Sequence, residues 1–225
     1  MLWSGTARPC ERRLADAGAW SVGPGQTIPL WAVFSAALAP VLLMGGWLIA
    51  DALQPVSYSP IHETVSALAG QGGTDRWVMT SALFLVGGLY LVTAAGLSLA
   101  GLPSRALLTV AGLASMGIAL SPEPVAGTTT QHLAWTVLGA ITIAIWPAFI
   151  RRRTDAVPLV VSWYATIAVT ILFIGLLGWL VSETQGGTAL GLAERLTVSV
   201  QSTWPFIVAL ALRRSTSRTA ELEPG

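Results

Sequence analysis

The run IPLWAVFSAALAPVLLMGGWLIADAL, residues 28–53, decides the fold of this chain. Its only charged residue is Asp51, which stands near the end of the run. The hydrocarbon core of a bilayer is about 30 Å thick and takes roughly 20 apolar residues in helical form. Because lipid offers no partner to backbone N–H and C=O groups, such a run must be a helix. We therefore predict a membrane-spanning helix here, with Asp51 paired or extended to the interface.

Five more apolar runs follow, separated by short segments rich in Gly, Pro, Ser and Thr. They cover residues 77–100, 104–121, 131–150, 158–181 and 192–212, and the third span of the resulting six is the shortest. The composition agrees, because 53% of the 225 residues are hydrophobic and only 10% are charged, against about 25% in soluble domains. We expect an all-α polytopic transmembrane bundle over 28–212, between tails over 1–27 and 213–225.

The arginines indicate the orientation of the spans. All 12 basic residues are arginine, and six spans would place both termini on one side of the membrane. Only Arg76 and Arg195 would lie on the other side. The arginines on the side of the termini are Arg8, Arg12, Arg13, Arg105, Arg151, Arg152, Arg153, Arg213, Arg214 and Arg218. Since positive charge favours cytoplasmic loops, we predict a plasma-membrane protein with both termini in the cytoplasm.

The loop YSPIHETVSALAGQGGTDRW, residues 58–77, holds one of the two histidines. Its Ser-Pro pair at 59–60 is typical of a helix start and Gly70 of a helix end, so we predict a short amphipathic helix over about 60–69 in this first extracytoplasmic loop. The helix is either a capped connector with a solvated polar face or one wall of a cavity between the spans. Its candidate ligand-binding residues are His62, Glu63 and Ser66.

His132, at the start of the fourth span, has two interpretations. It either donates a hydrogen bond to a neighbouring loop or acts as a general base or proton relay, with the nearby carboxylate of Glu123 as its catalytic partner. A zinc site that joins His62 and His132 is conceivable, since zinc accepts two histidines and a carboxylate. The sequence has no tight ligand spacing, and the single cysteine, Cys10, excludes a cysteine cluster. We therefore assign no metal and no cofactor.

Two acid–base dipeptides, Asp75-Arg76 and Glu194-Arg195, stand just before spans. Neighbours on a helix point about 100° apart, so pairing across helices is favoured over pairing within each dipeptide. One interpretation is charge neutralisation between spans. The other is an anion site, in which Arg76 and Arg195 bind a phosphate or carboxylate head group beside Glu194.

Three segments resemble a known family: SPIHETVSALA (59–69), SPEPVAGTTTQHLAW (121–135) and GLAERLTVSVQSTWPFIVAL (191–210). Over residues 28–212 the chain is similar to the domain-of-unknown-function 998 family of bacterial six-span membrane proteins. Members often have aspartate at position 123 and glutamine at position 194, where this chain has glutamate. The signature positions that the resemblance implies are Ser66, Glu123, His132, Glu194, Arg195 and Trp204.

These observations favour a binding protein that holds an anionic or amphipathic, lipid-like ligand in a polar pocket on the extracytoplasmic side. Arg76 and Arg195 would bind the head group, with the histidines and acids at the rim. The alternative is an outer-leaflet hydrolase or transferase on lipid or envelope intermediates, with His132 as base. A small transporter is less favoured, because spans three and four carry no charge at mid-membrane.

Membrane lipid is the expected partner. A net charge of +1 gives no case for nucleic acid, and the oligomeric state is not indicated.

Overall fold

A computed structural model describes residues 27–150 and 158–222 of the chain, with side chains up to residue 217. Within these ranges it is all-α. The long helices are α2 (Leu30–Ala52), α4 (Trp77–Gly96), α5 (Leu102–Leu120), α6 (Thr130–Ile145), α7 (Trp163–Glu183) and α8 (Leu190–Leu222). The short ones are α3 (Val65–Ala69) and the 3-10 turns η1 (Ser98–Ala100), η2 (Trp146–Phe149) and η3 (Leu159–Val161). The predicted N-terminal tail lies, up to residue 26, outside the described residues.

Five of these helical segments are long and apolar enough to cross a membrane: α2, α4, α5, α6 with η2, and α7. They match the first five predicted spans. The sixth predicted span falls in α8, which is not among the five because polar residues lower its hydropathy. Several of those residues point into the protein rather than outward. The buried ones are Arg195, Thr197, Gln201 and Ser202.

Some helix ends differ from the prediction for local reasons. Pro147 has no N–H to continue the α-helical pattern, and α6 passes into η2 at Trp146. The next helix begins at Trp163 rather than near 158, because the Ser162 hydroxyl accepts from the Ala165 N–H and caps it. At the other end of the chain, α8 continues to Leu222, so the predicted tail over 213–225 is largely helical.

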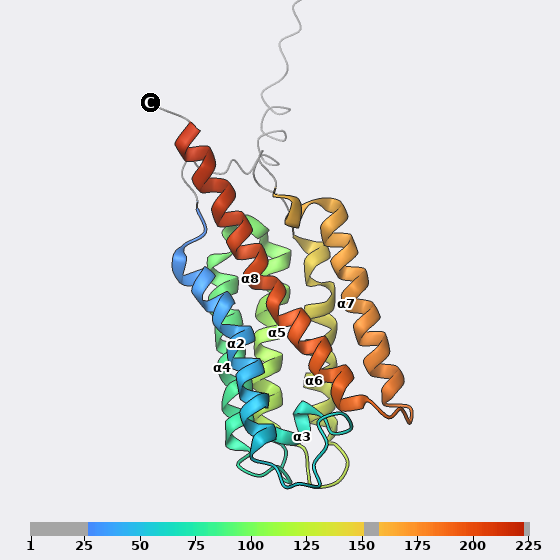
Figure 1. Cartoon of the computed structure of the whole chain (residues 1–225). Coiled ribbons are helices and arrows are strands. Elements are labelled where there is room, and N and C mark those ends of the chain that lie inside the picture. Colours follow the sequence, from blue (N-terminus) through green and yellow to red (C-terminus); the bar gives the residue numbers. More distant parts are fainter. Residues whose placement is uncertain (1–26, 151–157, 223–225) are drawn as a thin grey trace, which may run out of the picture.

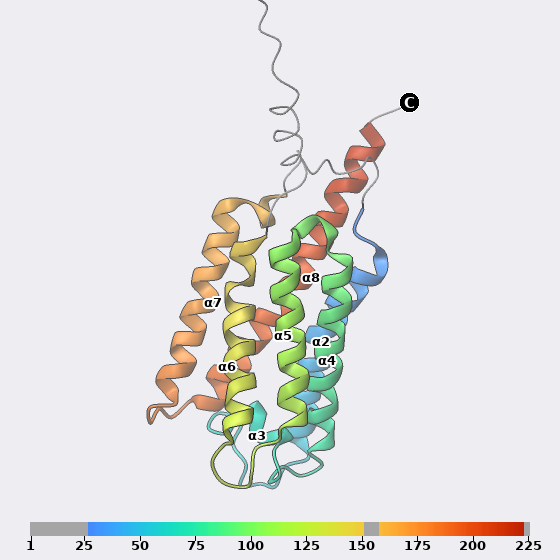
Figure 2. The ribbon, with the colours of Figure 1, turned by 180° about the vertical axis from the view of Figure 1, so that it is seen from behind.

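The long helices stand roughly side by side, and α8 runs the length of the bundle (Figures 1 and 2). Helices α2, α4, α5 and α8 surround most of the core, whereas α7 lies at the edge. The residues that α7 buries are Thr166, Thr170 and Phe173. Its many exposed apolar side chains suit a surface that faces lipid, since hydrocarbon does not repel them.

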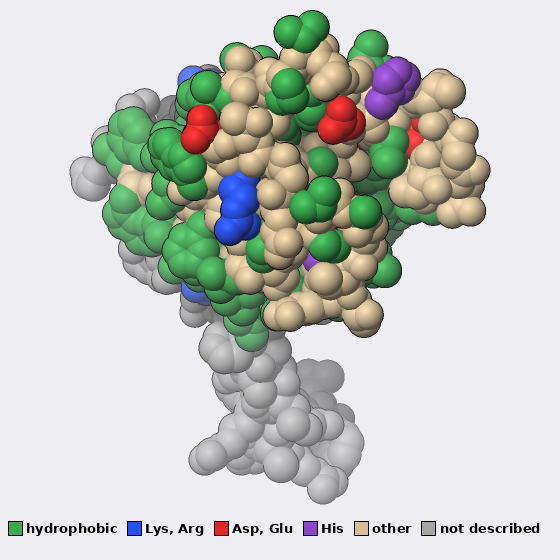
Figure 3. All heavy atoms as spheres, turned by 90° about the horizontal axis from the view of Figure 1, so that it is seen from below, with side chains coloured by type: hydrophobic (Ala, Val, Ile, Leu, Met, Phe, Trp, Pro, Cys, Tyr) green, Lys and Arg blue, Asp and Glu red, His purple; other side chains and the backbone are tan. Residues whose placement is uncertain are grey.

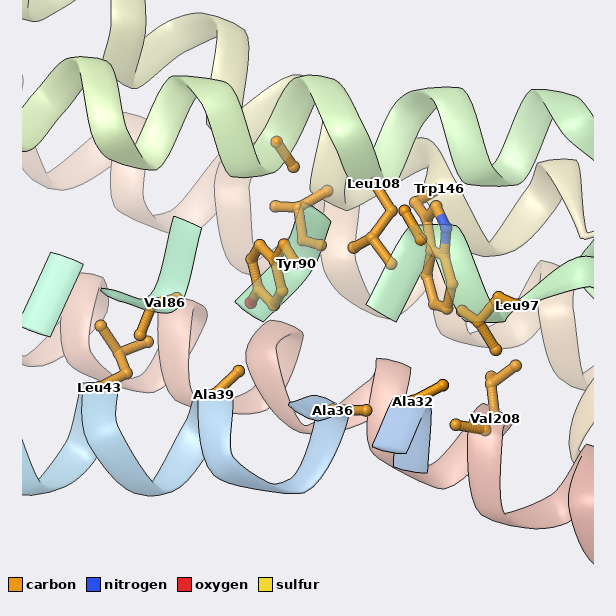
Figure 4. Packing of buried hydrophobic residues seen from close by; sticks show 14 of the residues in the cluster. Ala32, Ala36, Ala39, Leu43, Val86, Tyr90, Leu97, Leu108, Trp146 and Val208 are labelled. Carbon is orange, nitrogen blue, oxygen red and sulfur yellow. The ribbon is translucent and has the colours of Figure 1, made fainter. Parts of the chain in front are cut away.

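Small residues set the spacing of the core. Along α2, Ala32, Ala36 and Ala39 face inward at helical spacing, and Figure 4 shows them opposite larger side chains such as Trp146. A Cβ on Gly96 would come within 2.3 Å of the Ala32 Cβ, so α2 and α4 touch through glycine and alanine. Close approach of this kind is how helices associate in a membrane, where apolar burial alone gives no driving force.

The two ends of the bundle differ in charge. We call the end that carries α3 the α3 end. At the opposite end, the Arg105 guanidinium donates to the Ala94 and Ala95 carbonyls, the last turn of α4, and Arg213 donates to the Ile28 carbonyl. Arginines 8, 12, 13 and 151–153 lie outside the described residues. The acids whose side chains the structure describes lie at the α3 end, and the site is built there.

Candidate functional site

The loop between α2 and α4 folds back onto the end of the bundle. Its helix is α3, Val65–Ala69, which is shorter than the predicted 60–69. The Thr64 hydroxyl accepts from the Ala67 N–H over 3.0 Å, so Thr64 rather than Ser59 is the N-cap, while Gly70 is the C-cap as predicted. Four of the five α3 residues are buried. This helix therefore packs into the bundle and presents no solvated polar face.

Arg195, Asp51 and Tyr58 form a buried group at the α3 end, which we call the Arg195 cluster. The Arg195 Nη2 group donates to Asp51 Oδ1 over 2.7 Å, an ion pair between α8 and α2. The Tyr58 hydroxyl donates to the same Asp51 oxygen over 2.8 Å and accepts from Arg195 Nη2. Burial and the hydrogen bond to Asp51 raise the pKa of Tyr58 above its ordinary value, so the phenol keeps its proton. The expectation that Asp51 is paired is confirmed.

The other terminal nitrogen of Arg195 binds the backbone of the folded loop. Nη1 donates to the carbonyls of Pro60 over 2.8 Å and Glu63 over 2.7 Å, and to Gly191 over 3.2 Å. The guanidinium also lies 5.5 Å from the centre of the Trp47 ring, within cation–π distance. With both terminal nitrogens engaged, Arg195 has no free fork for a head group. We therefore assign Arg195 to charge neutralisation between helices α8 and α2 rather than to an anion site.

The start of α8 touches the same loop. The Leu192 N–H donates to the Ile61 carbonyl over 3.1 Å. A Cβ on Gly191 would lie 2.2 Å from the Glu63 carbonyl oxygen and 2.6 Å from that of Pro60. Only glycine leaves room for this approach, so the loop and α8 are fixed to each other at several points.

Glu194 contacts the first residues of α3. Its Oε2 accepts from the Val65 N–H over 2.7 Å, and its Oε1 accepts from the Ser66 hydroxyl over 3.3 Å. The first N–H groups of a helix have no acceptor within the helix, so Glu194 supplies one from α8. The structure thus brings Glu194 and Ser66, both predicted ligand-binding residues, into direct contact.

His132 and Glu123, the predicted catalytic residues, form a second pair. The His132 Nδ1 atom lies 2.7 Å from the Ser121 carbonyl oxygen, and because a carbonyl only accepts, Nδ1 carries a proton. The Nε2 atom lies 3.4 Å from Glu123 Oε1. This contact is not a hydrogen bond, and Nε2 is buried without a hydrogen-bond partner. His132 is 3% exposed, and its Nε2 faces the Glu123 carboxylate.

The remaining predicted residues, His62, Glu63 and Arg76, are exposed. Figure 3 shows the α3 end, where scattered charged and histidine side chains stand among apolar and uncharged ones. No side-chain polar partner is found for His62 or Arg76 within residues 27–150 and 158–217. Over the described part of the chain, no group of three His, Cys, Asp or Glu residues is arranged to hold a metal. His62 and His132 differ in setting, since one is exposed and the other buried.

A cavity of about 130 Å³ lies between the helices beneath α3, and we call it the central cavity. Its walls are mainly apolar, from residues such as Leu43, Leu83, Val86, Ile143 and Val198. The polar residues that line it are Ser66, Tyr90, Ser115, Thr136, Glu194, Thr197 and Gln201. Gln201 is only 3% exposed, and its side-chain Nε2 has no hydrogen-bond partner. The cavity therefore offers polar groups that the protein itself does not satisfy.

A second hollow, of about 370 Å³, opens at the surface of the α3 end. Glu63, Glu123 and Tyr58 line it together with loop backbone. The Gln71 N–H donates to the Glu123 carbonyl over 2.8 Å, which joins the loop before α4 to the loop before α6. The predicted residues are thus divided, with Glu63 and Glu123 at this surface hollow and Ser66 and Glu194 at the central cavity.

Sequence reasoning missed Tyr58, Tyr90 and Gln201. A signal existed for Gln201, because a polar amide within a span is costly in lipid and marks a functional candidate. No signal existed for Tyr58, because its contacts depend on the path of the loop between α2 and α4, and the sequence does not specify that path.

Comparison with known proteins gives one match. No curated protein and no solved structure matches the chain significantly. A family model described as protein of unknown function (DUF998) matches residues 37–211. This range includes α4, α5, α6 and α7 in full and most of α2 and α8. It also includes every residue of the Arg195 cluster, of the Glu194 contacts and of the His132–Glu123 pair. With its apolar helices the chain is a multi-pass membrane protein, and it belongs to the DUF998 family.

Proposed function

We propose that this protein binds one end of an amphipathic, lipid-like molecule in the central cavity. The observation that carries the proposal is the cavity itself, walled mainly by apolar side chains and lined by the Glu194 carboxylate and the unpartnered Gln201 amide. Ligand sites are mostly apolar with a few polar groups that fix orientation, and an unmet buried amide is costly unless something binds it.

The proposed topology places this cavity in the outer half of the plasma membrane. Helix α8 runs beside the five apolar helices and turns polar residues inward, which supports its role as a sixth span. Six spans put both termini on one side. Arg195 is neutralised by Asp51, which leaves Arg76 as the exposed arginine among the described residues of the α3 end. The positive-inside rule then favours cytoplasmic termini and an α3 loop outside.

Bound molecules on the purified protein test this function. We expect native mass spectrometry of the full chain, released from its own membranes in mild detergent, to detect an amphipathic adduct. Val198→Phe places a larger side chain in the cavity wall and should remove the adduct. Val200→Phe, on the same helix but 39% exposed, is the matched control and should keep it. Absence of any adduct on the unaltered protein, or its persistence on Val198→Phe, would contradict the proposal.

The His132–Glu123 pair supports a second candidate, a membrane-embedded hydrolase or transferase on lipid or envelope intermediates. A buried histidine oriented by a backbone carbonyl and facing a carboxylate has the arrangement that general acid–base catalysis requires. The test compares lipid extracts of cells that make the protein or its variants. A product lost with His132→Asn and Glu123→Gln but kept with His62→Asn would support an enzyme, and unchanged extracts would count against it.

A further inference from the structure

We infer that the molecule bound in the central cavity presents a protonated amine to Glu194, an inference that rests on the binding function proposed above. The polar end of the ligand would then be cationic, and not the anionic head group that the two arginine dipeptides suggest.

The argument begins with the charges at the α3 end. Among the described residues, Arg195 forms an ion pair with Asp51, and His132 lies beside Glu123. Glu194 belongs to neither. Although it is next to Arg195 in sequence, the guanidinium points to Asp51, and the groups that donate to Glu194 are neutral: the Val65 N–H and the Ser66 hydroxyl. An ionised carboxylate away from water is costly unless a cation pairs with it. Arg195 is near enough to act on Glu194 electrostatically, but its ion pair is with Asp51, and no cation among the described residues donates to Glu194.

The cavity gives that cation a place. Glu194 is the one charged residue among those that line the central cavity. An ammonium group there would gain an ion pair in surroundings of low dielectric constant, where such a pair is stronger than in water. A carboxylate or phosphate in the same position would instead place a second negative charge beside the first.

The Gln201 amide is an independent sign that a ligand is expected. It lies on the same face of α8 as Glu194, seven residues further on, or about 10 Å along the helix. Its Nε2 is buried without a partner. A cavity that only filled space between helices would favour apolar residues at both positions, because each unmet polar group lowers stability.

The volume of the central cavity limits how much of the ligand it can hold. A cavity of about 130 Å³ is close to the roughly 150 Å³ known to hold one benzene molecule in another protein. The part of the ligand that fits in the cavity is therefore about six to eight non-hydrogen atoms, which would be the amine and its first carbons. Hexylamine, hexan-1-ol and hexanoate are a matched set of probes of this size that differ in the charge of one end.

Thermal unfolding of the purified full chain in detergent at neutral pH tests the inference. A ligand that binds only the folded state raises the unfolding temperature. We expect hexylamine to bind about tenfold more tightly than hexanol or better, and hexanoate to bind most weakly. Equal or tighter binding of hexanoate or hexanol overturns the amine inference but leaves the binding function standing. Absence of a shift with all three probes contradicts the binding function itself.

Glu194→Gln isolates the charge. Glutamine keeps an oxygen to accept from the Val65 N–H, so α3 retains its contact with α8, and the preference for hexylamine over hexanol should disappear. A preference that survives in Glu194→Gln overturns the inference. If Glu194→Gln does not fold, Val198→Phe and Val200→Phe show whether the hexylamine shift arises in the cavity. A shift that Val198→Phe keeps overturns the inference. A shift that is lost in Val198→Phe but kept in Val200→Phe supports the inference.

Discussion

At the residue scale, Arg195 shows how one side chain can hold several elements together. Its guanidinium joins α8 to α2 through Asp51 and to the loop before α3 through the Pro60 and Glu63 carbonyls. Every one of these acceptors is negative or partly negative, which offsets the cost of removing the charge from water. Arginine suits this position because its planar fork donates in several fixed directions, which a lysine ammonium does not.

Removing one partner of this ion pair should be costly. We expect Asp51→Ala to lower the free energy of unfolding by about 3–5 kcal/mol, because it leaves the buried Arg195 charge unpaired. Denaturant titration in mixed micelles measures the change. Arg76→Ala, which removes an exposed arginine, is the control and should stay within about 0.5 kcal/mol of the unaltered protein. A similar small effect for both variants would refute the structural role of the Arg195 cluster.

At the scale of elements, adjacent glycines in α4 behave differently. A Cβ on Gly87 would lie 2.5 Å from the Gly112 carbonyl oxygen in α5 and 2.5 Å from Met116 Cγ, whereas a Cβ on Gly88 would have nothing within 4 Å. The sequence shows the pair Gly87-Gly88 but not which of the two faces a neighbouring helix. That depends on how α4 is rotated about its axis.

Substitution by alanine separates the two glycines. We expect Gly87→Ala to destabilise the protein by about 1–3 kcal/mol, because it forces α4 and α5 apart. Gly88→Ala should be neutral or stabilise by up to about 1 kcal/mol, since alanine is the better helix former. Unfolding of both variants in the same detergent provides the comparison. Equal effects would mean that the α4–α5 contact does not pass through Gly87.

At the scale of the whole molecule, the membrane orientation has a direct test. In a Cys10→Ser background we expect a membrane-impermeant maleimide to label Val125→Cys, at the α3 end, in intact cells. Arg214→Cys, exposed at the opposite end of α8, should react only after the membrane is permeabilised. The reverse pattern would invert the orientation. Labelling of both positions from one side would contradict a membrane-crossing α8.

The sequence by itself determined the class of the protein and the positions of its long helices. Apolar runs about 20 residues long have no other stable form in lipid, so α2, α4, α5, α6 and α7 were predictable within a few residues. Helix ends were less so, because they depend on caps and prolines such as Ser162 and Pro147. The sixth predicted span is the exception: α8 is not among the helices apolar enough to cross a membrane, and several of its polar residues are buried inside the bundle.

Only the tertiary structure decided which polar residues meet. The sequence named Glu123 as the nearby partner of His132, and the two side chains do lie together. The partners of the other two candidates lie far along the chain: Arg195 pairs with Asp51 and Glu194 with Val65 and Ser66. Such pairings depend on the rotation of each helix and on the path of a loop, and neither is encoded in local periodicity. The same is true of the central cavity, since a void between helices results from the shapes of all its walls together.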